Sequence, residues 1–111
     1  MRQNDRVRAS RPSFDFESVV TLWKPDSAWH FATVPEEASD EIAARMEGFT
    51  RGFGSVKVEA TIGGSTFSTS LFPDSESGCY VLPLKKSVRV AEGIVAGGTT
   101  RVHLELVEFT P

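Results

Sequence analysis

Apolar and polar residues alternate with a period of two in several segments of this chain, and this pattern constrains the fold most. The alternation is typical of β-strands that bury only one face. Such segments lie at residues 14–22, 29–32, 55–62, 66–72, 79–82 and 101–109. A strand with one apolar face cannot bury that face alone, so the strands are expected to close on one another.

The inward positions of these strands are rich in aromatic residues. We expect the following side chains to face the core: Phe14, Phe16, Trp29, Phe31, Phe67 and Leu71. The alternative role for such aromatics is a platform on which nucleic-acid bases stack.

Two short helices are expected between the strands. Pro35 ends one strand and opens a helix over residues 36–48, because proline cannot donate to a strand ladder but suits the first turn of a helix. Pro83 is expected to do the same for a helix over residues 84–92. Glu41 and Arg45 are spaced to form an i,i+4 ion pair on the first helix.

The two halves of the chain therefore follow the same plan of strand, turn, strand, proline, helix, glycines and strand. We predict a mainly β fold, a pseudo-twofold six-stranded barrel of two β-β-α-β halves capped by the two helices. Residues 1–12 are expected to form a flexible basic tail, and residues 13–111 a single domain. The alternative for the tail, which contains four arginines, is an arm that contacts nucleic acid.

Composition excludes several classes of function. The net charge of −3 makes nucleic acid an improbable partner, since phosphate neutralisation needs a basic surface. No apolar run approaches the ~20 residues of a membrane-spanning helix. Cys79 is the only cysteine, which favours a cytoplasmic location without disulfides. With His30 and His103 far from it in sequence, no metal site or cofactor is expected.

Several motifs resemble one prokaryotic family, the domain of unknown function family nineteen-oh-five. The similarity covers roughly residues 14–109, and its segments are Trp29-His30-Phe31 with Val34-Pro35, Thr61-Ile62-Gly63-Gly64, Thr69-Ser70-Leu71-Phe72-Pro73, and Leu82-Pro83-Leu84-Lys85-Lys86-Ser87-Val88-Arg89 with Ala91-Glu92-Gly93. The resemblance implies a double-split β-barrel, an architecture shared with swapped-hairpin transcription regulators and antitoxins. It implies no activity, cofactor or catalytic residue. Family members usually have an acidic residue after the glycine that precedes the last strand, where this chain has Gly97-Gly98-Thr99.

Three cations at the start of the second helix form the candidate site. Lys85, Lys86 and Arg89 lie where the helix dipole disfavours positive charge, and they would attract a small anion or a phosphate-bearing ligand. The alternative is that they are solvated, or that they pair with acids of the first helix, which carries Glu36, Glu37 and Asp40.

The remaining candidate residues give weaker indications of function. Trp23, Phe72 and Phe109 fall on outward positions and are candidates for an interaction surface. A barrel completed within one chain is expected to be a monomer, with a weak homodimer through these aromatics as the alternative. No catalytic constellation is found, since serines lack a Gly-x-Ser-x-Gly setting, and His103 with Glu105 is expected to form a polar surface. We therefore expect a non-catalytic binding or interaction domain for a small anion or a protein. The alternative is a nucleic-acid-binding regulator, by analogy of fold alone.

Overall fold

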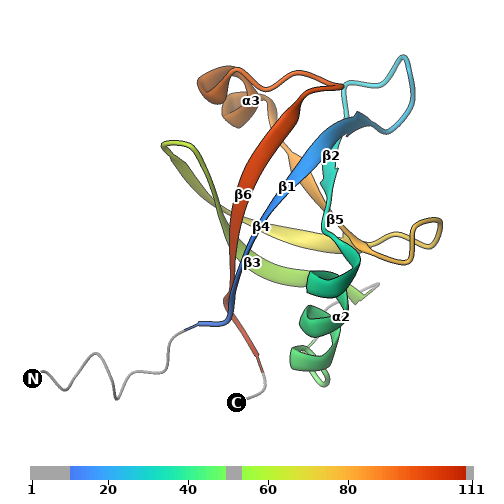
Figure 1. The fold of residues 1–111 in the computed structure, drawn as a ribbon, viewed down its shortest axis with the longest axis vertical. Helices are drawn as coiled ribbons and strands as arrows, with labels where there is room; N and C mark the ends of the chain where they lie inside the picture. The colour runs from blue at the N-terminus through green and yellow to red at the C-terminus, as the bar shows by residue number, and fades with distance from the viewer. Residues whose placement is uncertain (1–10, 50–53, 110–111) are drawn as a thin grey trace, which may run out of the picture.

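The computed structural model describes residues 11–49 and 54–109, and these form a barrel with a helix at each end (Figure 1). The elements follow in this order: β1 (Ser13–Leu22), β2 (His30–Thr33), α2 (Glu36–Arg45), β3 (Val56–Ile62), β4 (Ser65–Pro73), β5 (Tyr80–Leu84), α3 (Lys86–Glu92) and β6 (Thr99–Leu106). The six strands close into an antiparallel barrel in the order β1-β2-β5-β4-β3-β6. The mainly β barrel with two short helices is confirmed.

Closure depends on two long strands that change partner along their length. Residues 13–19 of β1 pair with β6, and residues 20–22 pair with β2. Residues 65–71 of β4 pair with β3, and residues 72–73 pair with β5. The pairs β2–β5 and β3–β6 complete the circle. Exchanging β1 with β4, β2 with β5, and β3 with β6 leaves this set of pairings unchanged.

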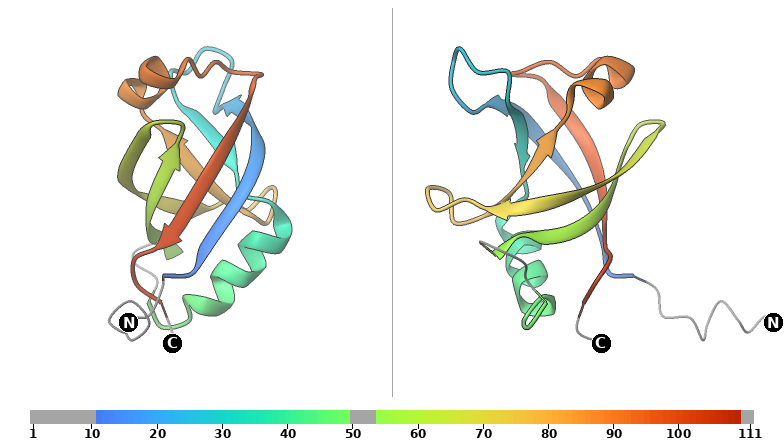
Figure 2. Two further views of the ribbon diagram at one scale, coloured as in Figure 1. Left: turned by 60° about the vertical axis from the view of Figure 1, so that its left-hand side comes forward. Right: turned by 180° about the vertical axis from the view of Figure 1, so that it is seen from behind.

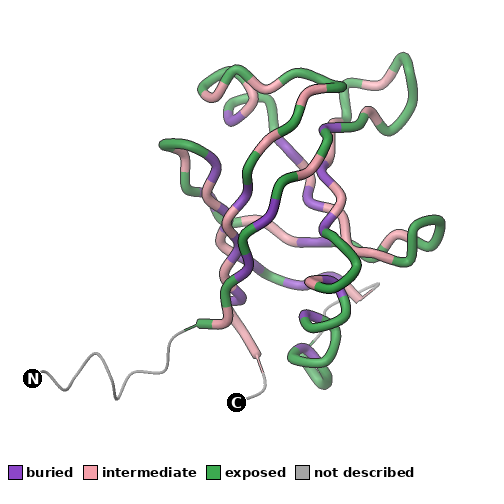
Figure 3. The backbone as a smooth tube through the Cα atoms, viewed as in Figure 1, coloured by how far each residue is buried: buried purple, intermediate pink, exposed green. Residues whose placement is uncertain are grey.

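The core lies inside the barrel. Buried and exposed residues alternate along the strands, because every second side chain points into it (Figure 3). Phe14, Phe16, Phe67 and Leu71 are buried as predicted. All four apolar side chains of β3 are buried too, and burying a Val or Leu side chain stabilises the fold by roughly 1.5–3 kcal/mol.

The predicted face of β2 was wrong. Ala32 is fully buried, whereas Trp29 is 54% exposed and Phe31 is only half-buried. Ala32 pairs with Leu82, and both side chains point into the core. Because successive side chains alternate between faces, this register places Phe31 on the outer face. Trp29 precedes the strand.

The start of the second helix also differs from the prediction. Pro83 and Leu84 belong to β5, where they pair with Phe31 and His30, and α3 begins only at Lys86. Leu84 is 3% exposed, so its place in the core holds this stretch in the strand. Proline is accepted there because β4 pairs with β5 only through Tyr80 and Val81, which leaves Pro83 at an edge of the ladder.

The first helix is closer to expectation. It begins at Glu36 after Pro35 and buries Ile42, while Glu41 and Arg45 lie 3.8 Å apart as the predicted ion pair. The two helices lie at opposite ends of the barrel in every view (Figure 2). In the described part of the chain, no helix has the length and apolar character needed to cross a membrane.

A carboxylate connects the far end of α3 to the β3–β4 turn. The Ser65 hydroxyl donates to Glu92 Oε2 at 2.5 Å, which places the carboxylate against Gly63 and Gly64. Gly63 has a φ of 57°, as a two-residue hairpin turn requires. This contact fixes the first half of β4 relative to α3.

The turn provides a stability test. Replacing Gly63 with alanine puts a Cβ on a left-handed residue and into the Glu92 carboxylate, and we expect a loss of about 1–2 kcal/mol in the free energy of unfolding. Gly64→Ala is the matched control, since its Cβ would lie 4.0 Å from Glu92 Oε2 and should change stability by less than about 0.5 kcal/mol. Urea unfolding measures both, and equal losses would contradict this role for Gly63.

Candidate anion-binding pocket

A pocket of about 340 Å³ opens where β4 and β5 part. The two strands pair only at Phe72–Val81 and Pro73–Tyr80, so the first half of β4 runs away from the second half of β5. Residues 28–30, 67–69 and 83–86 line the space, and Arg89 of α3 completes it. All three predicted cations therefore reach one pocket, and a volume near 300 Å³ suits a small ligand.

The side chain of Arg89 is anchored to the backbone of Leu84 beside this pocket. Its Nε donates to the carbonyl oxygen of Leu84 at 3.0 Å, and the residue is half-buried. Nε is one of the five N–H donors of a guanidinium, so the two terminal nitrogens keep their donors for another partner. Among the described residues, no carboxylate forms an ion pair with Arg89.

Ser39 occupies the equivalent place on α2 and shows what is unusual about Arg89. The Ser39 hydroxyl donates to Val34 O at 3.0 Å, also five residues back, and accepts the Tyr80 N–H at 3.0 Å. Its hydrogen bonds are thus complete inside the fold, whereas the guanidinium of Arg89 has capacity left.

The two lysines frame the same pocket from the end of β5. Both are exposed, and Lys85 Nζ lies 5.6 Å from the centre of the Phe67 ring, which forms part of the lining. Neither lysine forms an ion pair with any residue in the described ranges. The acids of α2 lie at the other end of the barrel, so the expected alternative of pairing with Glu36, Glu37 or Asp40 does not occur (Figure 2).

The conflict between the three cations and the helix dipole is weaker than the sequence predicted. Because α3 has seven residues and begins at Lys86, Arg89 lies in its last turn and Lys85 precedes it. Cations in a last turn agree with the dipole. The three residues are close because they lie within five positions of the chain, and the parting of β4 from β5 supplies the pocket that they line.

The opposite end of the barrel has a pocket of different chemistry. It measures about 370 Å³ and lies between α2 and the β4–β5 loop, with Asp40, Asp74, Cys79 and Tyr80 among its lining residues. Burial raises the pKa of the Tyr80 hydroxyl, and hydrogen bonds from Ser77 lower the pKa of Asp74. The titratable side chains here are acids, a phenol and a half-buried thiol, which do not attract an anion.

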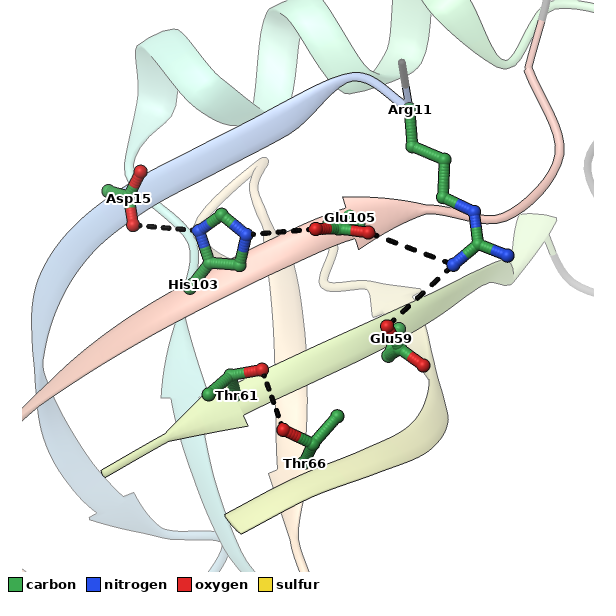
Figure 4. Close-up of polar contacts among 7 residues, drawn as sticks. All are labelled: Arg11, Asp15, Glu59, Thr61, Thr66, His103 and Glu105. Atoms are coloured by element: carbon green, nitrogen blue, oxygen red, sulfur yellow. Dashed lines mark hydrogen bonds and ion pairs between the residues drawn. The ribbon is translucent and has the colours of Figure 1, made fainter. Parts of the chain in front are cut away.

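A second polar cluster covers the outer face of β1, β6 and β3 (Figure 4). His103 Nδ1 lies 2.8 Å from Asp15 Oδ1, and Nε2 lies 3.2 Å from Glu105 Oε2. Arg11 bridges Glu105 and Glu59 at 3.7 Å each, which ties this residue of the predicted tail to the barrel. Residues 1–10 of that tail lie outside the described residues.

The two carboxylates change the chemistry of His103. Hydrogen bonds to Asp15 and, less strongly, to Glu105 raise the pKa of the imidazole, against a smaller opposing effect of burial. When His103 is protonated, the imidazolium donates from both nitrogens and has no lone pair with which to accept a proton. The contacts join Asp15, His103 and Glu105 into a polar surface across β1 and β6, as expected of His103 and Glu105.

This network predicts a pH dependence of stability. Because the folded-state pKa of His103 is raised, its contribution is complete below the unfolded value of about 6.5 and is lost as the pH rises through the folded-state pKa. We expect the free energy of unfolding of the wild type, relative to His103→Gln, to fall from pH 6 to pH 8.5 in urea titrations. Asp15→Asn should reduce this difference, and parallel pH curves for wild type and His103→Gln would contradict it.

The structure does not bring the three outward aromatics into one surface. Trp23 is 57% exposed at the end of β1, whereas Phe109 follows β6 at the opposite end and packs against the core. Phe72 is 39% exposed on β4, beside Val81. Trp23 instead contacts Trp29 edge to face, with ring centres 6.2 Å apart. In the described residues, no group of three or more His, Cys, Asp or Glu could hold a metal ion.

Trp29 and His30 are among the pocket residues that sequence reasoning missed. Both were assigned to a four-residue strand, residues 29–32, whose inward face was wrongly inferred from Trp29 and Phe31. The missed signal was Val34, which extends the alternation of Ala32 past Thr33 and identifies the inward face.

A comparison with protein families supports the resemblance found in the sequence. The model of a family described as Domain of unknown function (DUF1905) matches residues 16–104, and the chain belongs to this family. The matched range includes the whole pocket. A search of curated proteins finds no match to this chain.

Proposed function

We propose that this chain is a non-catalytic binding domain that holds a small anion, such as phosphate, in the pocket between β4, β5 and α3. One observation carries the proposal: Arg89 is anchored through Nε to Leu84 O and lines a pocket that Lys85 and Lys86 also line. No carboxylate lines that pocket.

The physical argument rests on uncompensated charge. Three cations around one small space repel each other, and an anion placed among them relieves that repulsion. The planar guanidinium fork matches two oxygens of a phosphate or carboxylate, and such charge-assisted hydrogen bonds are about twice as strong as neutral ones. Because Arg89 is already anchored, binding orders fewer rotatable bonds of its side chain.

The non-catalytic assignment is part of the same proposal. Paired acid and base groups would be needed for hydrolysis or transfer, and the pocket offers cations and His30 but no carboxylate. His103, the other histidine, has both nitrogens engaged by Asp15 and Glu105. We also place the domain in the cytoplasm, with its single cysteine reduced, and as a monomer, since the barrel closes within one chain.

Titration with inorganic phosphate at constant ionic strength tests the proposal. We expect amide resonances of residues 85–89 to move in NMR spectra of the ¹⁵N-labelled chain. Removing a charged hydrogen-bond donor costs about 1.5–3 kcal/mol, so Arg89→Gln should weaken binding roughly 10- to 100-fold. Arg89→Lys keeps the charge but loses the fork, and should fall between wild type and Arg89→Gln.

Lys57→Gln is the matched control, because it removes an exposed cation of β3 that does not line this pocket. Its phosphate affinity should equal that of the wild type. Binding that is unchanged in Arg89→Gln, or weakened equally by Lys57→Gln, would overturn the assignment of the pocket. A gel shift of duplex DNA at low salt that disappears in Arg89→Gln would instead favour a nucleic-acid-binding regulator.

A further inference from the structure

We infer that the anion bound in this pocket carries an aromatic ring, which stacks on the indole of Trp29 while its phosphate or carboxylate group contacts Arg89. This inference rests on the proposed function and specifies the class of ligand. Its basis is the juxtaposition of an exposed tryptophan with the three cations in one pocket.

Trp29 is exposed in an unusual way for so large an apolar side chain. It is 54% exposed, although it lies directly before β2 and lines the pocket. Its backbone is nevertheless fixed: the backbone N–H of Trp29 donates to Ser27 Oγ at 2.9 Å, and its carbonyl accepts the backbone N–H of Trp23 at 2.8 Å. The Trp23 ring contacts the Trp29 ring at an interplanar angle of 81°. The backbone hydrogen bonds and this ring contact restrict Trp29 before a ligand arrives, which lowers the entropy cost of stacking on it.

The other walls of the pocket also suit a flat, partly apolar group. His30 lies beside Trp29, and its Nδ1–H donates to Ala28 O at 2.8 Å, which fixes the imidazole orientation. Phe67 is 8% exposed and receives Lys85 at its ring, and Pro83 adds an apolar surface. The lining thus combines aromatic and apolar groups with the three cations.

The size of the pocket points the same way. Its volume of about 340 Å³ lies within the range of roughly 300–1,000 Å³ found for sites that bury an organic ligand. An inorganic phosphate alone would leave most of this space and the Trp29 ring in contact with water. A ring attached to the anion would remove that apolar surface from water, and an aromatic pair in favourable geometry adds roughly two- to tenfold in affinity.

The test compares phenyl phosphate with cyclohexyl phosphate, which has a similar size but no aromatic ring. Isothermal titration calorimetry gives Kd for both compounds on wild type, Trp29→Leu, Trp29→Phe and Arg89→Gln. We expect wild type to bind phenyl phosphate two- to tenfold more tightly than cyclohexyl phosphate. The preference should vanish in Trp29→Leu and be restored in part by Trp29→Phe, whereas Arg89→Gln should weaken both compounds alike. Benzoate, measured in parallel, distinguishes carboxylate from phosphate as the anionic group.

The outcomes separate this inference from the proposed function. Equal affinity for the two compounds, or a preference that survives Trp29→Leu, overturns the aromatic ligand while leaving an Arg89-dependent anion site in place. Binding that does not depend on Arg89 removes the anion site itself, and the inference with it. Far-UV circular dichroism of each variant confirms folding before titration, and Trp29→Phe keeps the test valid if Trp29→Leu does not fold.

Discussion

The barrel depends on a single geometric constraint, that β1 and β4 each pair with two different partners along their length. Neither strand could satisfy its backbone groups with one neighbour. The pairing of β1 with β6 ends at residue 19, and the pairing of β4 with β3 ends at residue 71. The change of partner joins two four-stranded sheets into a closed surface and protects strand edges that would otherwise be open to other chains. The same change opens a gap where β4 leaves β5, so the pocket is a direct product of the way the barrel closes.

Much of this architecture was encoded in local sequence patterns. The alternation at Val56, Val58, Ala60 and Ile62 fixed the inward face of β3, because seven residues give the pattern enough length to be unambiguous. In β2 the strand has four residues, and the large side chain of Trp29 suggested burial that the pairing with β5 does not allow. The start of α3 was misplaced for a related reason: Pro83 indicated a helix start, but the burial of Leu84 kept the chain extended for two more residues.

The candidate site was predictable in part. Lys85, Lys86 and Arg89 stood out because they broke a local electrostatic preference, and the structure brings all three to one pocket. The hydrogen bond from Arg89 Nε to Leu84 O could not be foreseen, since it depends on where α3 begins. Trp29 and His30 were also beyond local reasoning, because their place in the pocket follows from pairings between residues about fifty positions apart.

The placement of the two helices has an electrical consequence. α2 carries exposed Glu36, Glu37 and Asp40 at one end of the barrel, and the described cations Lys85, Lys86 and Arg89 lie at the other. Charges of opposite sign at the two ends give this part of the molecule a permanent dipole along the barrel. In the field of an approaching anion, such a dipole turns the α3 end forward and repels the anion from the α2 end. A barrel with nearly twofold pairing thus presents two electrically different ends to an approaching ion.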